Sequence, residues 1–166
     1  WYRQMVGISS IGDTTVVTDK WMLGTRNSFI VGISATFLAT ALGTVAALGL
    51  SRPHMPFKGT IMAILISPMI VPLIITAAGM FFFYSKVGLT HSYIGLILAH
   101  TALGTPFVVI TVTATLTGFD TNLIRASQSL GADTMRTFFK VIMPLILPGV
   151  ISGALFAFIT SFDEVV

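Results

Sequence analysis

The sequence predicts an all-α protein, a polytopic bundle of about four transmembrane helices with one polar helical loop outside the bilayer. Of its 166 residues, 54% are hydrophobic and 9% are charged, whereas a soluble domain has about a quarter of its residues charged. Four runs without Asp, Glu, Lys or Arg cover residues 27–51, 59–85, 87–119 and 141–162. Each is longer than the roughly 20 residues that an α-helix needs to cross the hydrocarbon core. The polar interruption at 125–144 predicts two short amphipathic helices beside the membrane.

The charge and the residue types of the chain exclude several classes of function. The formal net charge is +3, but no Lys/Arg cluster with interleaved aromatic residues is present, so no nucleic acid partner is expected. The chain has no Cys and therefore no disulfide framework, thiolate metal site or cysteine nucleophile. It has no Gly-rich phosphate loop of the G-x4-G-K-[ST] kind, so it cannot be an ATPase. Because it begins at Trp1 and stops at Val166, we expect it to be a piece of a longer protein.

Residues 1–26 are expected to form an extracytoplasmic, interfacial segment before the first crossing. Trp1, Tyr2, Met5 and Ile8 can share one apolar helix face, and Gly12, Asp13 and Thr14 then predict a turn. Aromatic side chains commonly lie at the headgroup level, which favours a short interfacial helix followed by a loop. A plain linker is the alternative.

The first two crossings differ in how they are expected to pack. The first, at about 28–50, is rich in small residues, which let helix backbones approach closely in lipid. The second, at about 60–83, contains Pro68 and Pro72. Proline removes a backbone hydrogen bond and kinks a helix, and the bilayer tolerates this only where neighbouring groups satisfy the freed carbonyls. We therefore expect a kinked helix inside the bundle and regard both prolines as candidates to line a path.

The third crossing, at about 93–116, and the fourth, at about 144–165, contain the remaining candidate path residues. His100 has no His, Asp or Glu at helical spacing, so no metal site is predicted. A lone intramembrane His more often hydrogen-bonds a neighbouring helix than binds a ligand. Asp163 and Glu164 could attract a cationic solute, but they lie roughly 28–30 Å beyond the start of the fourth crossing, so a wetted helix end is the alternative.

The distribution of basic residues suggests which side of the membrane each loop occupies. Four crossings place the loop at residues 52–58 and the segment 125–144 on one side, with five Lys or Arg residues against four on the other side. Under the positive-inside rule, the side with five basic residues is predicted to be cytoplasmic.

Local sequence signals define the polar loop, which we place at residues 117–143. Asp120 or Thr121 can cap its first helix, and Asp133 can cap its second. Gly131 lies where a left-handed residue would end the first helix. Pro144 either ends the unit or opens the fourth crossing at its first turn. The apolar sides of the two helices consist of Leu123, Ile124, Ser127 and Leu130, and of Met135, Phe138, Phe139 and Ile142.

This loop resembles the EAA loop of the membrane permease subunits of ATP-binding-cassette (ABC) importers. The family pattern is Glu-Ala-Ala, three residues, Gly, nine residues, an aliphatic residue, any residue, Leu and Pro. Here it falls on Arg125-Ala126-Ser127, Gly131 and Val141-Ile142-Met143-Pro144, with Arg125 in place of Glu and Ser127 in place of the second Ala. Other segments of the chain resemble the spermidine/putrescine branch of this family, namely Arg26-Asn27-Ser28, Pro68, Pro72, Ala99-His100-Thr101 and Ser161-Phe162-Asp163-Glu164-Val165.

The resemblance implies a non-catalytic permease subunit with the type I importer fold, in which 27–166 is a partial transmembrane domain in the bacterial inner membrane. It implies two ATPase subunits that bind ATP and Mg, a second homologous permease, a periplasmic or lipid-anchored solute-binding protein, and a polyamine or similar cationic solute. No cofactor is expected on this chain. The implied docking residues are Arg125, Ala126, Ser127, Leu130, Gly131, Ala132, Met135, Phe138, Phe139 and Pro144.

Three alternatives to this function remain. An intramembrane enzyme is disfavoured because no G-x-S-x-G motif or paired carboxylates are present. A secondary transporter would often show internal repeats with broken helices at matching positions, and no convincing repeat is visible. A structural membrane subunit that is not coupled to an ATPase is the third.

Overall fold

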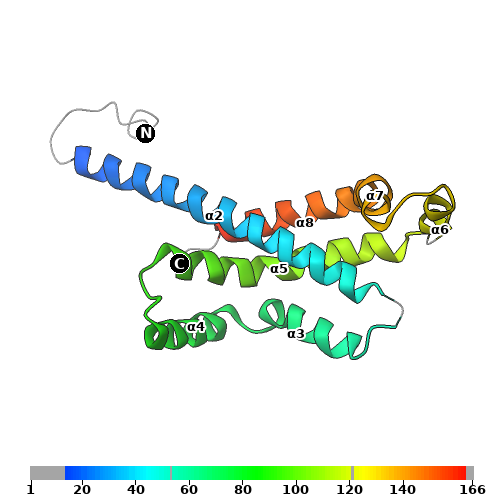
Figure 1. The fold of residues 1–166 in the computed structure, drawn as a ribbon. Helices are drawn as coiled ribbons and strands as arrows, with labels where there is room; N and C mark the ends of the chain where they lie inside the picture. The colour runs from blue at the N-terminus through cyan, green and yellow to red at the C-terminus, as the bar shows by residue number, and fades with distance from the viewer. Residues whose placement is uncertain (1–13, 53, 121, 164–166) are drawn as a thin grey trace.

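The computed structural model describes residues 14–52, 54–120 and 122–163, and every regular element in these ranges is a helix. Three helical stretches are long and apolar enough to cross a membrane, or four if one bent pair is a single span. The predicted all-α bundle is therefore confirmed. In chain order the elements are α2 (Thr14–Leu50), α3 (Lys58–Ile70), α4 (Leu73–Val87), α5 (Tyr93–Thr117), α6 (Asn122–Ser129), α7 (Thr134–Thr137), the π-helix η1 (Phe138–Ile142) and α8 (Met143–Asp163) (Figure 1).

The core of the molecule lies between α2, α5 and α8, which pack lengthwise against one another. Helices α2 and α5 run parallel, because Tyr93 donates its hydroxyl hydrogen to Asn27 at one end while Gly43 faces Val108 further along. Helix α8 runs antiparallel to both. The residues at the centre of the core are small or β-branched, namely Ala39, Ala47, Val108, Val112, Ile146 and Ala157.

Two glycines allow the close approach of these helices. A Cβ atom at Gly43 would lie 2.7 Å from the Cβ of Val108, and one at Gly153 would lie 2.5 Å from the Oγ1 of Thr111. Both distances are too short for a real side chain, so α5 could not pack as closely against α2 and α8 if these residues had one. The small-residue packing predicted for the first crossing is confirmed.

Helix α2 begins earlier than the sequence analysis placed the first crossing. It is continuous from Thr14 to Leu50, so a loop within residues 14–26 is wrong, while Gly12 and Asp13 of the predicted turn lie outside the described residues. Within that stretch, the Thr25 hydroxyl donates to the carbonyl of Trp21 and the Ser28 hydroxyl to that of Gly24. These side chains bond back to the helix rather than ending it. The predicted apolar face at residues 1–8 lies outside the described residues.

The second crossing is broken, which corrects the prediction of one kinked helix at 60–83. Helices α3 and α4 meet at an angle of 101°. The break lies at Val71, which is extended (φ −72°, ψ 135°), and Pro72 stands at the N-terminus of α4. A residue before proline is disfavoured in the helical region, so the helix ends there. Pro68 stays inside α3. The bent pair is a broken span or a re-entrant segment.

Pro144 lies in the first turn of α8, which is one of the two predicted alternatives, but no break precedes it. Helices α7, η1 and α8 form one continuous helical stretch from Thr134 to Asp163. The ring of Pro144 would clash with the carbonyl of Lys140 in a regular α-helix. The backbone N–H of Met143 instead bonds to the carbonyl of Phe138, five residues earlier. This π-turn widens the helix where proline enters.

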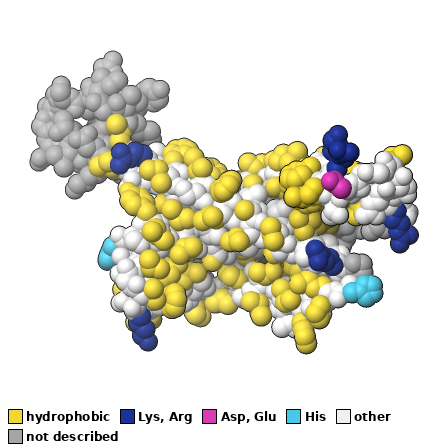
Figure 2. All heavy atoms as spheres, viewed as in Figure 1, with side chains coloured by type: hydrophobic (Ala, Val, Ile, Leu, Met, Phe, Trp, Pro, Cys, Tyr) yellow, Lys and Arg dark blue, Asp and Glu magenta, His cyan; other side chains and the backbone are white. Residues whose placement is uncertain are grey.

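The outer surface fits a membrane environment. Figure 2 shows hydrophobic side chains over much of the visible face of the helices, with Lys and Arg side chains towards the two ends. Phe37 and Ile74 are 74% and 83% exposed. Contiguous apolar surface of this extent is rare on soluble monomers.

Candidate functional site

The polar loop forms a helix pair, α6 and α7, at the end of the bundle where α5 finishes (Figure 1). A side-chain carboxylate caps each helix. Asp120 accepts from the backbone N–H of Asn122 at 2.9 Å, and Asp133 accepts from that of Arg136 at 2.7 Å. The caps predicted at Asp120 and Asp133 are confirmed, while Thr121 lies outside the described residues.

Gly131 forms the turn between the two helices, and its φ of +80° is left-handed. The backbone N–H of Ala132 bonds to the carbonyl of Ser127 at 3.1 Å, and that of Gly131 bonds to the carbonyl of Gln128 at 2.9 Å. This pair of bonds is the Schellman arrangement that ends a helix at a left-handed glycine. The predicted conformation of Gly131 is therefore confirmed.

A hydroxyl pair joins α6 to α7. The Oγ of Ser127 lies 2.9 Å from the Oγ1 of Thr137, and Thr137 is buried. The Ser127 hydroxyl also donates to the carbonyl of Ile124 at 2.9 Å. Because Ser127 has one hydroxyl proton, Thr137 is then the donor of the bond between the helices. The sequence analysis assigned Ser127 to docking, whereas the structure places its hydroxyl between the helices. The signal it missed was a polar residue on an otherwise apolar stripe.

Replacing Ser127 with alanine should loosen the helix pair. We expect the change to lower stability by about 0.5–1.5 kcal/mol, because the Thr137 hydroxyl loses its partner across the turn. Replacing Thr137 with valine in the Ser127→Ala variant should then cause little further loss of stability. A double-mutant cycle on thermal unfolding in detergent measures this coupling, and additive effects of the two changes would contradict it.

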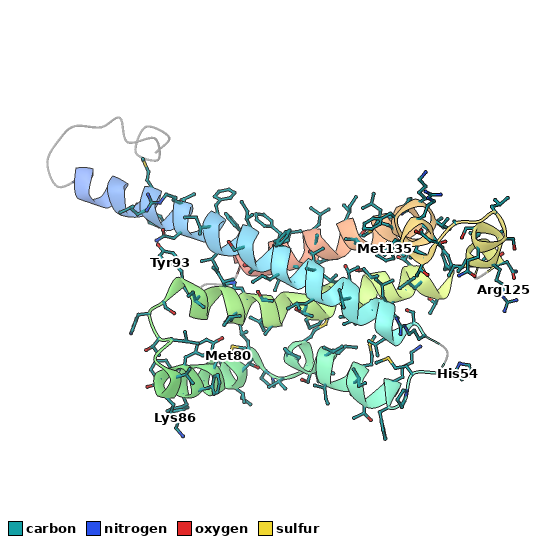
Figure 3. All side chains as sticks on the ribbon, viewed as in Figure 1. His54, Met80, Lys86, Tyr93, Arg125 and Met135 are labelled. Carbon is teal, nitrogen blue, oxygen red and sulfur yellow. The ribbon has the colours of Figure 1, made fainter. Side chains whose placement is uncertain are left out.

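The outward surface of the helix pair combines apolar and basic side chains. We call Arg125, Leu130, Met135 and Phe139 the tip surface. Leu130, Met135 and Phe139 are 88%, 69% and 60% exposed, and Arg125 is exposed as well. Figure 3 labels Arg125 and Met135 at the end of the bundle opposite Lys86 and Tyr93.

The other implied docking residues lie around the tip surface. Phe138 is half-buried and packs edge-to-face on Phe139, with the ring centroids 5.1 Å apart. Ala126 and Pro144 are exposed, and Ala132 is half-buried. The implied docking residues are therefore all exposed or half-buried, and the hydroxyl of Ser127 is engaged between the helices. Their role in docking stays a prediction.

The described candidate path residues lie on different elements. His100 is buried in α5, and its Nδ1 lies 2.9 Å from the Oγ of Ser161 in α8, which is the contact with a neighbouring helix that the sequence favoured. Pro68 and Pro72 belong to the separate α3–α4 pair. Asp163 is exposed at the end of α8, and Glu164 lies outside the described residues. A path role for these residues stays a prediction.

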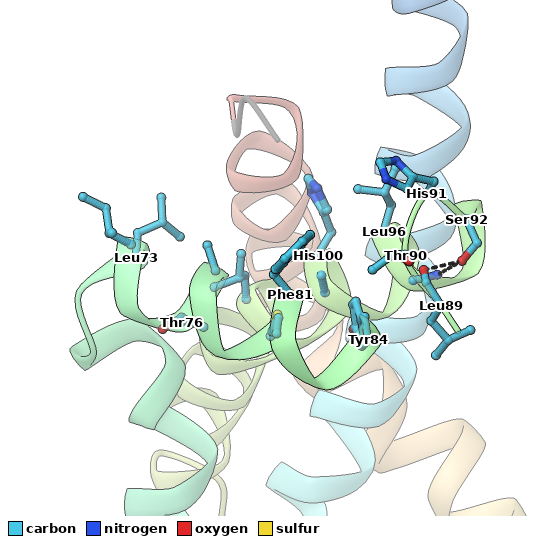
Figure 4. A pocket seen from close by; sticks show the side chains of 16 residues that line it. Leu73, Thr76, Phe81, Tyr84, Leu89, Thr90, His91, Ser92, Leu96 and His100 are labelled. Atoms are coloured by element: carbon cyan, nitrogen blue, oxygen red, sulfur yellow. Dashed lines mark hydrogen bonds between the residues drawn. The ribbon is translucent and has the colours of Figure 1, made fainter. Parts of the chain in front are cut away.

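An apolar cavity of about 520 Å³, which the sequence analysis missed, lies between α4 and α5 (Figure 4). His100 and Tyr84 are among the residues that line it. Beside it, Ser92 caps α5 by accepting from the backbone N–H of Gly95 and donates its hydroxyl hydrogen to the carbonyl of Leu89. Among the described residues, no group of three or more His, Cys, Asp or Glu side chains could hold a metal ion. The cavity is suited to apolar groups.

A bundle of membrane-spanning helices with a capped helix pair at one end is the architecture of a membrane-embedded transport subunit. The chain belongs to the family of binding-protein-dependent transport system inner membrane components, whose model matches residues 21–166. It is thus a multi-pass inner membrane protein of a family of transport permeases, and the predicted membership is confirmed. The match begins at residue 21, within α2, whereas the sequence analysis began the domain at 27.

Several curated proteins are similar to the chain. It is 34% identical to a spermidine/putrescine transport system permease protein of Haemophilus influenzae, over 84% of this chain and 54% of the relative. It is 29% identical to the protein of that name in Escherichia coli K12, over 89% of this chain and 56% of the relative. A probable molybdenum ABC transporter permease protein of Haloferax volcanii is 27% identical, over 91% of this chain and 59% of the relative. The chain spans about half the length of the curated relatives it matches.

Proposed function

We propose that the chain is a permease subunit of an ATP-driven ABC importer and forms half of a translocation path for a small solute. Two ATPase subunits, which bind ATP and Mg, would dock on the cytoplasmic tip surface. A second homologous permease would complete the path, and a solute-binding protein would deliver the solute on the opposite side. The observation that supports this best is the exposed apolar tip surface on a firmly capped helix pair, in a chain of this family.

The continuous helix supplies a route from docking to transport. Helix α7 leads through η1 into α8 without a break, and α8 packs along α5 and α2. A displacement of the tip surface would therefore move α8 as a rigid body against its neighbours, as in other domain motions driven by a bound partner. The wider π-turn before Pro144 lies between the docking end and the spanning end of this helix.

The solute class we favour is a polyamine or a similar small cation. The two relatives at 34% and 29% identity are named for spermidine and putrescine, while the relative named for molybdenum is 27% identical. In this proposal the basic loops face the cytoplasm, and exposed Asp163 at the other end of α8 would meet the incoming ammonium groups. Such a carboxylate near the membrane surface attracts cations.

Replacing Phe139 with alanine tests the docking assignment. We expect the change to reduce solute-stimulated ATP hydrolysis by the assembled transporter about tenfold or more, because aromatic anchors in an interface often contribute 2 kcal/mol or more to binding. The measurement is ATPase activity in lipid nanodiscs together with co-purification of the ATPase subunit.

Phe83 provides a matched control for Phe139. Both side chains are 60% exposed, but Phe83 lies on α4 and not on the helix pair. Phe83→Ala should leave co-purification of the ATPase unchanged. If Phe139→Ala assembles and hydrolyses ATP like the parent, the tip surface is not the docking site. If the parent never binds an ATPase yet still transports the solute, a secondary transporter replaces the importer.

A further inference from the structure

The segment 120–142, which comprises the helix pair and the adjoining η1, has three basic side chains, Arg125, Arg136 and Lys140, against two carboxylates. All three basic side chains are exposed. Both of its capping carboxylates, Asp120 and Asp133, accept hydrogen bonds from backbone N–H groups. Arg125, Arg136 and Lys140 form no ion pair with the carboxylates among the described residues. The basic groups of the helix pair are therefore available to an external partner.

Position separates Arg125 from the other two cations. Arg136 and Lys140 belong to the first part of the continuous helix Thr134–Asp163, which is a candidate membrane span. Basic side chains near the end of such a span commonly meet lipid headgroups. Arg125 belongs to α6, which is not part of any candidate span. Figure 3 shows Arg125 at the outermost end of the molecule, on α6. A protein surface is therefore the nearer candidate for Arg125.

Arg125 also projects away from the contact between α6 and α7. Ser127 and Ile124 lie on the inner stripe of α6 and are half-buried. Arg125 is two residues before Ser127, and at 100° per residue their side chains leave the helix about 160° apart. The guanidinium group consequently projects from the side of α6 that faces away from α7.

We propose that Arg125 pairs with a carboxylate on the rim of the ATPase groove that receives the helix pair, and thereby selects the matching ATPase subunit. This inference rests on the proposed function. The permease pattern that the loop resembles has Glu at this position, so an ATPase fitted to that pattern would meet the wrong charge here. Opposite charges across an interface favour the correct partner, and like charges exclude the wrong one. A guanidinium group can also bind a carboxylate through two parallel hydrogen bonds.

The test measures the affinity of the ATPase subunit for the permease assembly in nanodiscs, at about 50 and about 300 mM salt. We expect Arg125→Gln to weaken binding about tenfold at low salt and to reduce its salt dependence. Arg125→Glu should weaken binding further. Changing the acidic groove residue to lysine in the Arg125→Glu background should restore affinity. Lys86→Gln is the control, because Lys86 lies at the opposite end of the molecule (Figure 3).

The outcomes distinguish this inference from the proposed function. If Arg125→Gln binds like the parent with the same salt dependence, while Phe139→Ala still weakens binding, the charge pairing is wrong and the docking site stands. If no ATPase binds the parent, the proposed function itself fails. If the effect of Arg125→Gln appears only in nanodiscs of anionic lipid and vanishes in zwitterionic ones, Arg125 contacts headgroups, and the inference is overturned.

Discussion

Replacing Gly153 with alanine is expected to destabilise the bundle by about 1–3 kcal/mol, the usual cost of adding a methyl group to a tightly packed core. The new Cβ would lie 2.5 Å from the Oγ1 of Thr111 and 2.8 Å from the backbone Cα of Val108. The backbone atom cannot move unless α5 moves, and the Thr111 hydroxyl is held by hydrogen bonds to carbonyls in its own helix. The measurement is thermal unfolding in detergent, followed by circular dichroism.

Gly79 provides the control for this experiment. It lies in α4, and a Cβ there would have no atom within 4 Å. Gly79→Ala should therefore be neutral or stabilise its helix by about 0.5–1 kcal/mol. If Gly153→Ala unfolds at the same temperature as Gly79→Ala, α5 and α8 do not pack as closely as the structure indicates.

Replacing Gly131 with valine is expected to reduce solute-stimulated ATP hydrolysis about tenfold. A β-branched residue at this φ of +80° would have a conformational energy about 1–2 kcal/mol higher. We therefore expect the turn to open and the angle between α6 and α7 to change. No atom lies within 4 Å of the position of the new Cβ, so the expected cost comes from the backbone conformation and not from a clash of the Cβ. ATPase activity of the assembled transporter, with unfolding of the bundle as a second readout, measures it.

The variant Gly131→Asn distinguishes the effect of backbone strain from the effect of adding any side chain at this position. Asn adopts the left-handed region more readily than other residues, so Gly131→Asn should keep most of the stimulated activity. Equal losses for valine and asparagine would show that the left-handed turn is not what matters. A valine variant with full activity would show that the angle between α6 and α7 has no part in coupling.

Local signals in the sequence predicted the helix pair well. Asp120 and Asp133 were predicted as caps and Gly131 as the left-handed turn, and all three are found in these roles. Each of these signals depends on a few neighbouring residues and on backbone geometry alone. The pairing of Ser127 with Thr137 was not predicted, because it depends on how two helices pack and not on either helix by itself.

The helix boundaries were harder to predict where proline and polar residues are involved. Pro68, Pro72 and Pro144 each suggested a kink or an end, yet only Pro72 marks a break. Pro68 is accommodated within α3, and the π-turn before Pro144 absorbs the missing N–H group. The polar stretch before residue 27 looked like a loop, but α2 runs through it from Thr14, and the hydroxyl of Thr25 bonds to the carbonyl of Trp21.

The sequence by itself determined the number of apolar segments, the membrane location and the local design of the helix pair. Hydrophobicity over about 20 residues and capping over about four are properties of contiguous chain. Only the tertiary structure decided which helices form the core, where the second crossing breaks, and that α7 continues into α8. The meeting of Gly153 with Val108 and of His100 with Ser161 depends on packing between residues more than 40 positions apart in the sequence. No local pattern records such contacts.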